Sequence, residues 1–86
     1  MKYTKNQRLL KSKRPIDCLK ITEHIFKEEI FGYSFNTELY SHEGYAYLLT
    51  DNKSLVTMLN DEFKDIFEYH FGEIPQDSES VYKSNS

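Results

Sequence analysis

The stretch "YSFNTELYSHEGYAYLLTD", residues 33–51, predicts a β-hairpin. In its first half, apolar and polar residues alternate as far as Leu39, which is the period of a strand with one buried face. A second run of aromatic and aliphatic residues begins at Tyr45. The short polar segment between the runs has the length of a hairpin turn, and Gly44 within it can adopt positive φ.

Helical periodicity on the N-terminal side of the hairpin predicts a helix over residues 17–31. Pro15 suits the first turn because its missing N–H would have no partner there, and Gly32 is a suitable C′ residue. A second interpretation begins the helix later, with Thr22 as N-cap, and leaves residues 16–21 extended. One side of the predicted helix is apolar and carries Cys18, Leu19, Ile21, Ile25, Phe26 and Ile30.

A second amphipathic pattern follows the hairpin and predicts a helix over residues 55–71. Several residues with N-capping side chains precede it. Gly72 ends the pattern, and Pro75 prevents the helix from resuming. The apolar side of this helix carries Leu55, Val56, Met58, Leu59, Phe63, Ile66, Phe67 and His70.

Polar segments flank this helix–hairpin–helix unit. Residues 1–14 have no apolar stripe and are predicted to be a flexible basic arm, and residues 74–86 are predicted to be a disordered tail. Residues 15–73 are predicted to form one small α+β domain in the order helix, β-hairpin, helix (αββα). Because two strands alone are marginally stable, the sheet is a candidate for completion by homodimerisation or by a partner's strand.

Charge is divided unevenly along the 86 residues. The formal net charge is −3, but residues 1–16 contain no acid and carry +6, so residues 17–86 carry −9. Such a basic segment either anchors an anionic partner or neutralises the chain's own acidic surface. The basic side chains are Lys2, Lys5, Arg8, Lys11, Lys13 and Arg14.

The sequence disfavours a membrane-spanning protein and a secreted protein. The apolar runs are far shorter than the roughly 20 residues that span a bilayer, and no apolar signal-peptide region follows the basic start. Cys18 is the only cysteine, so an intrachain disulfide is impossible and a cytoplasmic location is expected. The usage of Lys, Asn, Ile, Tyr and Glu is typical of low-GC bacteria and their phages.

No motif indicates catalysis, a metal or a cofactor. His24, His42 and His70 form no HxxxH or HExxH pair, and the sequence has no CxxC. The three glycines are scattered, so there is no phosphate-binding loop and no GxSxG nucleophile elbow. We therefore predict a protein that is not an enzyme and that needs no cofactor or metal.

The tyrosines of the hairpin and the acids of the second helix are the candidate binding residues. A tyrosine on an exposed sheet face offers a rigid apolar body with a polar tip, as at many protein interfaces, although cross-strand aromatic pairs also stabilise small sheets. We predict a small regulatory or inhibitory protein that covers the working surface of a protein partner. Its candidate contact residues are Tyr33, Tyr40, Tyr45, Tyr47, Asp61, Asp65 and Glu68.

An alternative is a nucleic-acid-binding module. The basic arm would supply phosphate contacts, and the hairpin tyrosines would stack on bases. The net charge of −9 after residue 16 and the lack of a recognition-helix pattern oppose it. Binding of the arm to an anionic membrane is disfavoured because the arm has no amphipathic apolar face.

Overall fold

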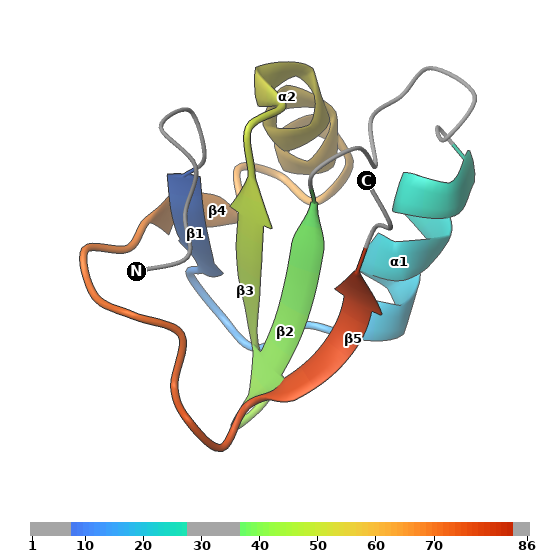
Figure 1. The fold of residues 1–86 in the computed structure, drawn as a ribbon. Coiled ribbons are helices and arrows are strands. Elements are labelled where there is room, and N and C mark those ends of the chain that lie inside the picture. Colours follow the sequence, from blue (N-terminus) through green and yellow to red (C-terminus); the bar gives the residue numbers. More distant parts are fainter. Residues whose placement is uncertain (1–7, 28–36, 84–86) are drawn as a thin grey trace.

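A computed structural model of the protein describes residues 8–27 and 37–83, which form a small α+β domain (Figure 1). Its five strands make one antiparallel sheet in the order β4-β1-β3-β2-β5, and two helices pack on it. In chain order the elements are β1 (Arg8–Ser12), α1 (Cys18–Lys27), β2 (Glu38–His42), β3 (Tyr45–Thr50), α2 (Lys53–Glu62), β4 (Phe67–Tyr69) and β5 (Glu79–Lys83).

The predicted hairpin is confirmed over its described part. Strands β2 and β3 pair from Glu38 opposite Leu49 to His42 opposite Tyr45. The two residues of the turn, Glu43 and Gly44, have φ of 53° and 85°. Positive φ at both central positions suits the right-handed twist of the two strands, so the turn fixes their register.

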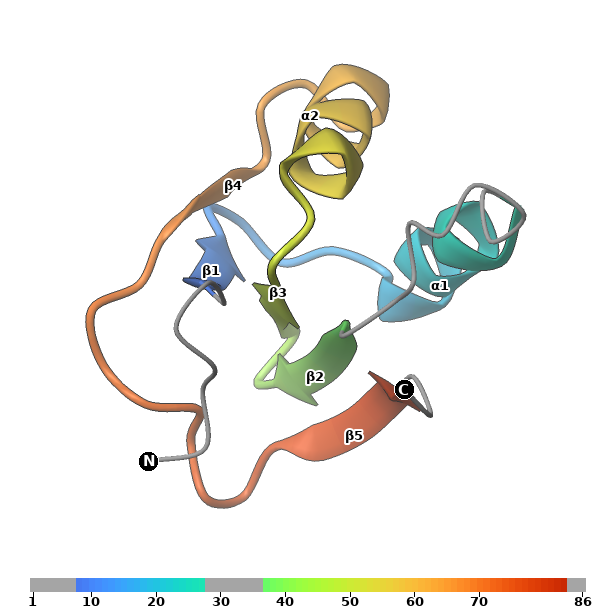
Figure 2. The ribbon, with the colours of Figure 1, turned by 45° about the horizontal axis from the view of Figure 1, so that its top comes forward.

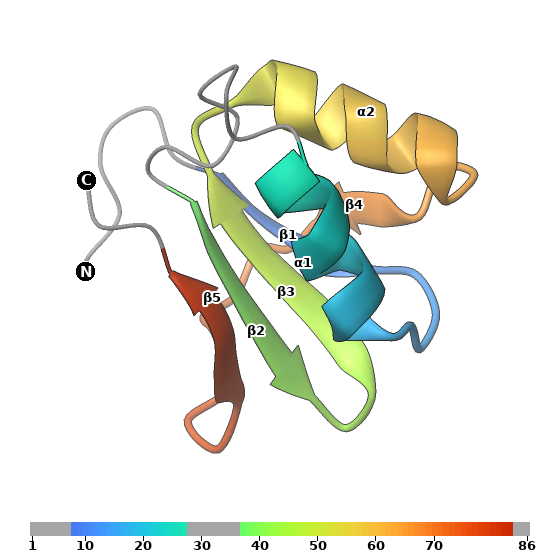
Figure 3. The same ribbon diagram turned by 90° about the vertical axis from the view of Figure 1, so that its right-hand side faces the viewer.

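Both helices cover the same face of the sheet (Figures 2 and 3). On that face Leu48 of the central strand β3 lies opposite Leu10 of β1 and Leu39 of β2. Buried side chains from α1 and α2 close over these leucines to form the main core. This core consists of Leu10, Cys18, Ile21, Ile25, Leu39, Ala46, Leu48, Leu55, Leu59, Ile66, Phe67 and Tyr82.

The other face of the sheet is crossed by residues 70–78, which connect β4 at one edge to β5 at the opposite edge (Figure 2). Ile74 of this connection packs on a second, smaller cluster formed by Leu9, Tyr47 and Leu49. Strands β1 and β3 are therefore covered on both faces.

The prediction that residues 1–14 form a flexible arm is wrong for residues 8–14. Residues 8–12 form β1, which lies inside the sheet between β3 and β4. Leu9 and Leu10 are both buried, on opposite faces. A strand that is buried on both faces has no alternating pattern, so the periodicity of the sequence does not reveal it.

The second helix is shorter than the predicted 55–71. It begins at Lys53, because the Asn52 side chain caps it by accepting a hydrogen bond from Leu55 N–H at 3.1 Å, and it ends at Glu62. Lys64 and Asp65 then adopt φ of 59° and 58°, which turns the chain back toward the sheet. After this turn, Ile66 is buried in the core and Phe67 begins β4, although the spacing of both residues also fitted a helix.

The first helix begins at Cys18, where the Asp17 carboxylate accepts a hydrogen bond from Leu19 N–H at 2.9 Å. The alternative that places the N-cap at Thr22 is therefore wrong. The helix is described as far as Lys27, and the rest of the predicted span, residues 28–31, lies outside the described residues.

The prediction of a disordered tail over residues 74–86 is also wrong where β5 forms. Tyr82 in β5 is buried and lies opposite Leu39, and a register shift opposite Leu39 and Tyr40 leaves Val81 as an extra residue. With β1, β4 and β5 added to the hairpin, the sheet has five strands from one chain. The reason for expecting dimerisation, a sheet of only two strands, does not apply.

Candidate functional site

The predicted tyrosine surface lies on the sheet face that residues 70–78 cross. Tyr47 is only 4% exposed and packs between Leu9, Leu49 and the crossing segment. Tyr40 and Tyr45 are half-buried beside it, and Tyr33 lies outside the described residues. Tyr47 is therefore not accessible to a partner. Its packing fits the second role considered for the hairpin tyrosines, which is to stabilise the sheet.

Polar contacts fix the other side chains on this face. Lys11 Nζ lies 4.7 Å from the centroid of the Tyr45 ring and 5.6 Å from that of Tyr47, within cation–π distance. The Tyr40 hydroxyl donates a hydrogen bond to Glu38. His42 Nδ1 lies 3.1 Å from an Asp77 carboxylate oxygen, which ties the crossing segment to the hairpin.

The three predicted acidic residues are exposed but do not form one line on a helix. Asp61 is on α2, Asp65 is in the turn after it, and Glu68 is on β4 opposite Lys11. Asp65 forms an ion pair with Lys13 at 3.0 Å. The chain's own basic segment therefore forms an ion pair with Asp65, and its strand β1 runs beside Glu68.

The basic residues that were assigned to an arm have internal contacts over the described part. Besides Lys11 and Lys13, Arg14 donates a hydrogen bond to the Phe63 carbonyl oxygen at 2.9 Å. Among these contacts, the ion pair of Lys13 with Asp65 is the one that neutralises an acidic side chain of the same chain. Lys2 and Lys5 lie outside the described residues.

Sequence reasoning missed the exposed aromatic residues at the β4 edge. Phe71 is 97% exposed, and Tyr69 on β4 is 58% exposed. Two further exposed apolar residues, Leu19 and Phe26, lie on α1, where the Phe26 ring packs edge-on against Tyr82. Nothing in the sequence distinguishes these side chains from the buried members of the same apolar runs.

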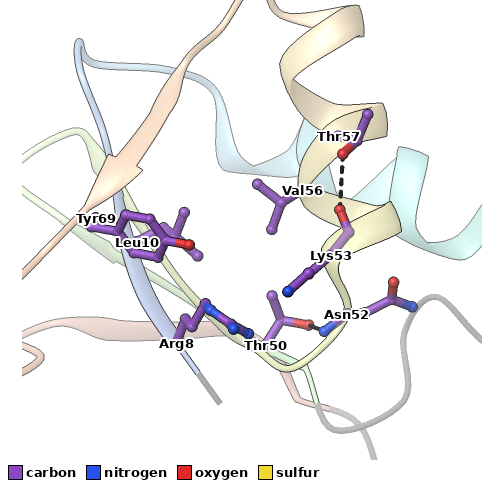
Figure 4. A pocket seen from close by; sticks show the side chains of 8 residues that line it. All are labelled: Arg8, Leu10, Thr50, Asn52, Lys53, Val56, Thr57 and Tyr69. Atoms are coloured by element: carbon purple, nitrogen blue, oxygen red, sulfur yellow. Dashed lines mark hydrogen bonds between the residues drawn. The ribbon is translucent and has the colours of Figure 1, made fainter. Parts of the chain in front are cut away.

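A pocket of about 230 Å³ lies between β1, β4 and the first turn of α2 (Figure 4). Arg8 from β1 and Lys53 from α2 bring two cations to it, and Tyr69 forms one wall. No sequence signal identified it, because its residues are far apart in the chain. The lining residues are Arg8, Leu10, Thr50, Asn52, Lys53, Val56, Thr57 and Tyr69.

Cys18 is not suited to nucleophilic chemistry. It is buried in the main core at the start of α1. Burial raises the pKa of its thiol, the negative charge of Asp17 raises it further, and a hydrogen bond with Ser41 opposes both. Because the thiolate is the reactive form, a thiol that stays protonated at neutral pH is inert.

Residues 8–27 and 37–83 contain neither a metal-binding cluster nor a membrane-spanning helix. Within them, no three His, Cys, Asp or Glu side chains come together as a metal site would require. No helix in these ranges has the length and apolar character to cross a membrane. Comparison with known proteins found no matching family model, no similar curated protein and no similar solved structure.

Proposed function

We propose that this protein is a small non-enzymatic binding protein that regulates or inhibits a protein partner by covering part of its surface. The observation that supports this proposal is the almost complete exposure of Phe71 beside the exposed ring of Tyr69. Large aromatic side chains held in water are unfavourable, and aromatic residues are frequent hot spots of protein interfaces.

The chemistry of the partner follows from what surrounds these rings. We define the β4-edge surface as Glu68, Tyr69, Phe71 and Glu73, all of which are exposed. β4 is an edge strand of the sheet, so its outer side pairs with no strand of this chain among the described residues. Glu68 and Glu73 are close to the two rings in the sequence, so an apolar pocket with basic side chains at its rim is the partner surface that fits this edge.

This proposal moves the contact residues away from the hairpin. Tyr47 is buried and Tyr45 lies under Lys11, whereas Glu68 keeps the role predicted for it. Asp61 and Asp65 precede β4 in the chain; both are exposed, but the Asp65 carboxylate is paired with Lys13.

The test is a single substitution, Phe71→Ser, in a binding experiment. Cross-linking to a lysate of the producing organism, with nuclease added and at two salt concentrations, would recover the partner with the wild-type protein. We expect Phe71→Ser to reduce recovery at least about tenfold, since interface aromatic anchors contribute roughly 2 kcal/mol or more. Because the ring is 97% exposed, the melting temperature should not change.

The matched control is Leu19→Ser, which removes an exposed apolar side chain from α1, near the opposite edge of the sheet. It should leave recovery of the partner unchanged. Equal recovery with wild-type and Phe71→Ser protein, or equal loss with both variants, would show that the β4-edge surface is not the contact.

The nucleic-acid alternative receives less support. The basic residues 11, 13 and 14 already contact tyrosine rings, a carboxylate and a carbonyl oxygen of the same domain. Loss of the recovered complex upon nuclease treatment would nevertheless favour it over a protein partner.

A further inference from the structure

We propose that the pocket between β1, β4 and α2 binds a small organic anion with a flat apolar body, such as an aryl phosphate or an aromatic carboxylate. This site shares Tyr69 with the β4-edge surface proposed above, but it does not include Phe71, on which the proposed protein contact depends. Charge, lining and size support it independently.

The charge of the pocket is the first reason. Arg8 and Lys53 come from different elements, and Figure 4 shows their side chains extending from opposite walls toward the same space. None of the eight lining residues is acidic, although the chain has a net charge of −3. Two cations that face one partly enclosed space attract an anion and favour a group with two or more acceptor oxygens, such as a phosphate or a carboxylate.

The apolar part of the lining is the second reason. Leu10 is buried at the base of the pocket, and Val56 of α2 is half-buried beside it. The Tyr69 ring forms a side wall, and Figure 4 shows its hydroxyl directed into the same space. An inorganic ion would use only the cations, whereas a ligand with a ring would also remove these apolar surfaces from water.

Local hydrogen bonds fix Thr50 and Thr57 in the lining of the pocket. The Thr50 hydroxyl accepts a hydrogen bond from Asn52 N–H at 3.1 Å and shares another with the buried Thr37 hydroxyl at 2.8 Å. The Thr57 hydroxyl bonds to the Lys53 carbonyl oxygen at 3.0 Å. A preformed site loses little entropy when a ligand binds.

The volume limits the size of the ligand. Pockets for drug-sized molecules are usually about 300–1,000 Å³, so 230 Å³ fits a ligand of roughly ten non-hydrogen atoms. A nucleoside triphosphate is too large. One aromatic ring with one anionic group matches both the size and the lining.

The experiment is an NMR titration of the full chain with phenyl phosphate, benzoate, inorganic phosphate and benzyl alcohol. We expect phenyl phosphate or benzoate to shift the amide signals of Arg8, Lys53 and Tyr69 with a Kd of about 1 mM or tighter, which is within reach of so small a ligand. Inorganic phosphate and neutral benzyl alcohol should each bind at least about tenfold more weakly, because each lacks one half of the recognised chemistry. The comparison of phenyl phosphate with benzoate identifies the preferred anionic group.

Two lysine variants make the titration specific. Lys53→Met should weaken binding of the better ligand at least about tenfold, and Lys20→Met, which removes an exposed lysine from α1, should not change it. Phe71→Ser should also leave it unchanged, so this proposal and that of a protein partner can fail separately. The proposal is overturned if neither aryl anion shifts these signals, if benzyl alcohol binds equally well, or if the two lysine variants behave alike.

Discussion

A chain that lacks residues 1–14 is expected to be unfolded. The deletion removes β1, which pairs with β3 on one side and with β4 on the other. It also removes the buried side chains of Leu9 and Leu10, and loss of one buried leucine side chain already costs about 2–5 kcal/mol. An average protein of this length has a total stability of roughly 4–13 kcal/mol. Circular dichroism and thermal unfolding would measure the result.

The control distinguishes the loss of strand β1 from the loss of the positive charges that follow it. Lys13→Gln combined with Arg14→Gln removes the ion pair with Asp65 and the hydrogen bond to Phe63, but leaves β1 intact. Since both contacts are exposed, this double variant should lose no more than about 1 kcal/mol. A truncated chain that kept a cooperative thermal transition and the wild-type near-UV spectrum would contradict this role for β1.

Leu48→Ala is expected to be the most damaging of the single core substitutions that keep the backbone intact. Leu48 is fully buried on the central strand β3, opposite Leu10 on one side and Leu39 on the other, under both helices. Its neighbours belong to different elements and are held by the sheet, so they cannot collapse into the cavity. We expect a loss of about 3–5 kcal/mol, measured by urea unfolding.

Leu19→Ala is the matched control, because it is the same change at a residue that is 68% exposed on α1. It should alter the free energy of unfolding by less than about 0.5 kcal/mol. Similar losses for the two substitutions would mean that Leu48 is not at the centre of the core.

The sequence correctly predicted those elements whose local residue pattern fits a single type of secondary structure. The alternation that ends at Leu39, together with a glycine at position 44, predicted the hairpin, and the stripe containing Ile21 and Ile25 predicted α1. Capping residues also marked the start of α2, near Asn52. In these segments the local periodicity and the tertiary burial agree.

The three remaining strands have no such pattern, each for a physical reason. β1 is buried on both faces, so its apolar residues are adjacent and do not alternate. β4 has three residues and follows a turn in which Lys64 and Asp65 adopt positive φ with no glycine to mark it. In β5 the extra residue Val81 interrupts the alternation.

The candidate site depends on the strand order, which no local pattern specifies. Tyr45 and Tyr47 are on the expected hairpin, but residues 70–78 cross their face, so Tyr47 is buried and Tyr45 is half-buried. Arg8 and Tyr69 line one pocket only because β4 pairs with β1. The residue types that favour binding were therefore identifiable from the sequence, whereas their accessibility required the three-dimensional arrangement.

Amide hydrogen exchange of the intact chain, measured residue by residue by NMR, tests most directly whether the basic N-terminal segment is an inner strand of the sheet. We predict that the amides of Leu10 and Lys11 exchange about as slowly as that of Leu48, because β1 has a partner strand on both sides. Exchange of these two amides at the rate of an unstructured peptide, with Leu48 still protected, would contradict the account.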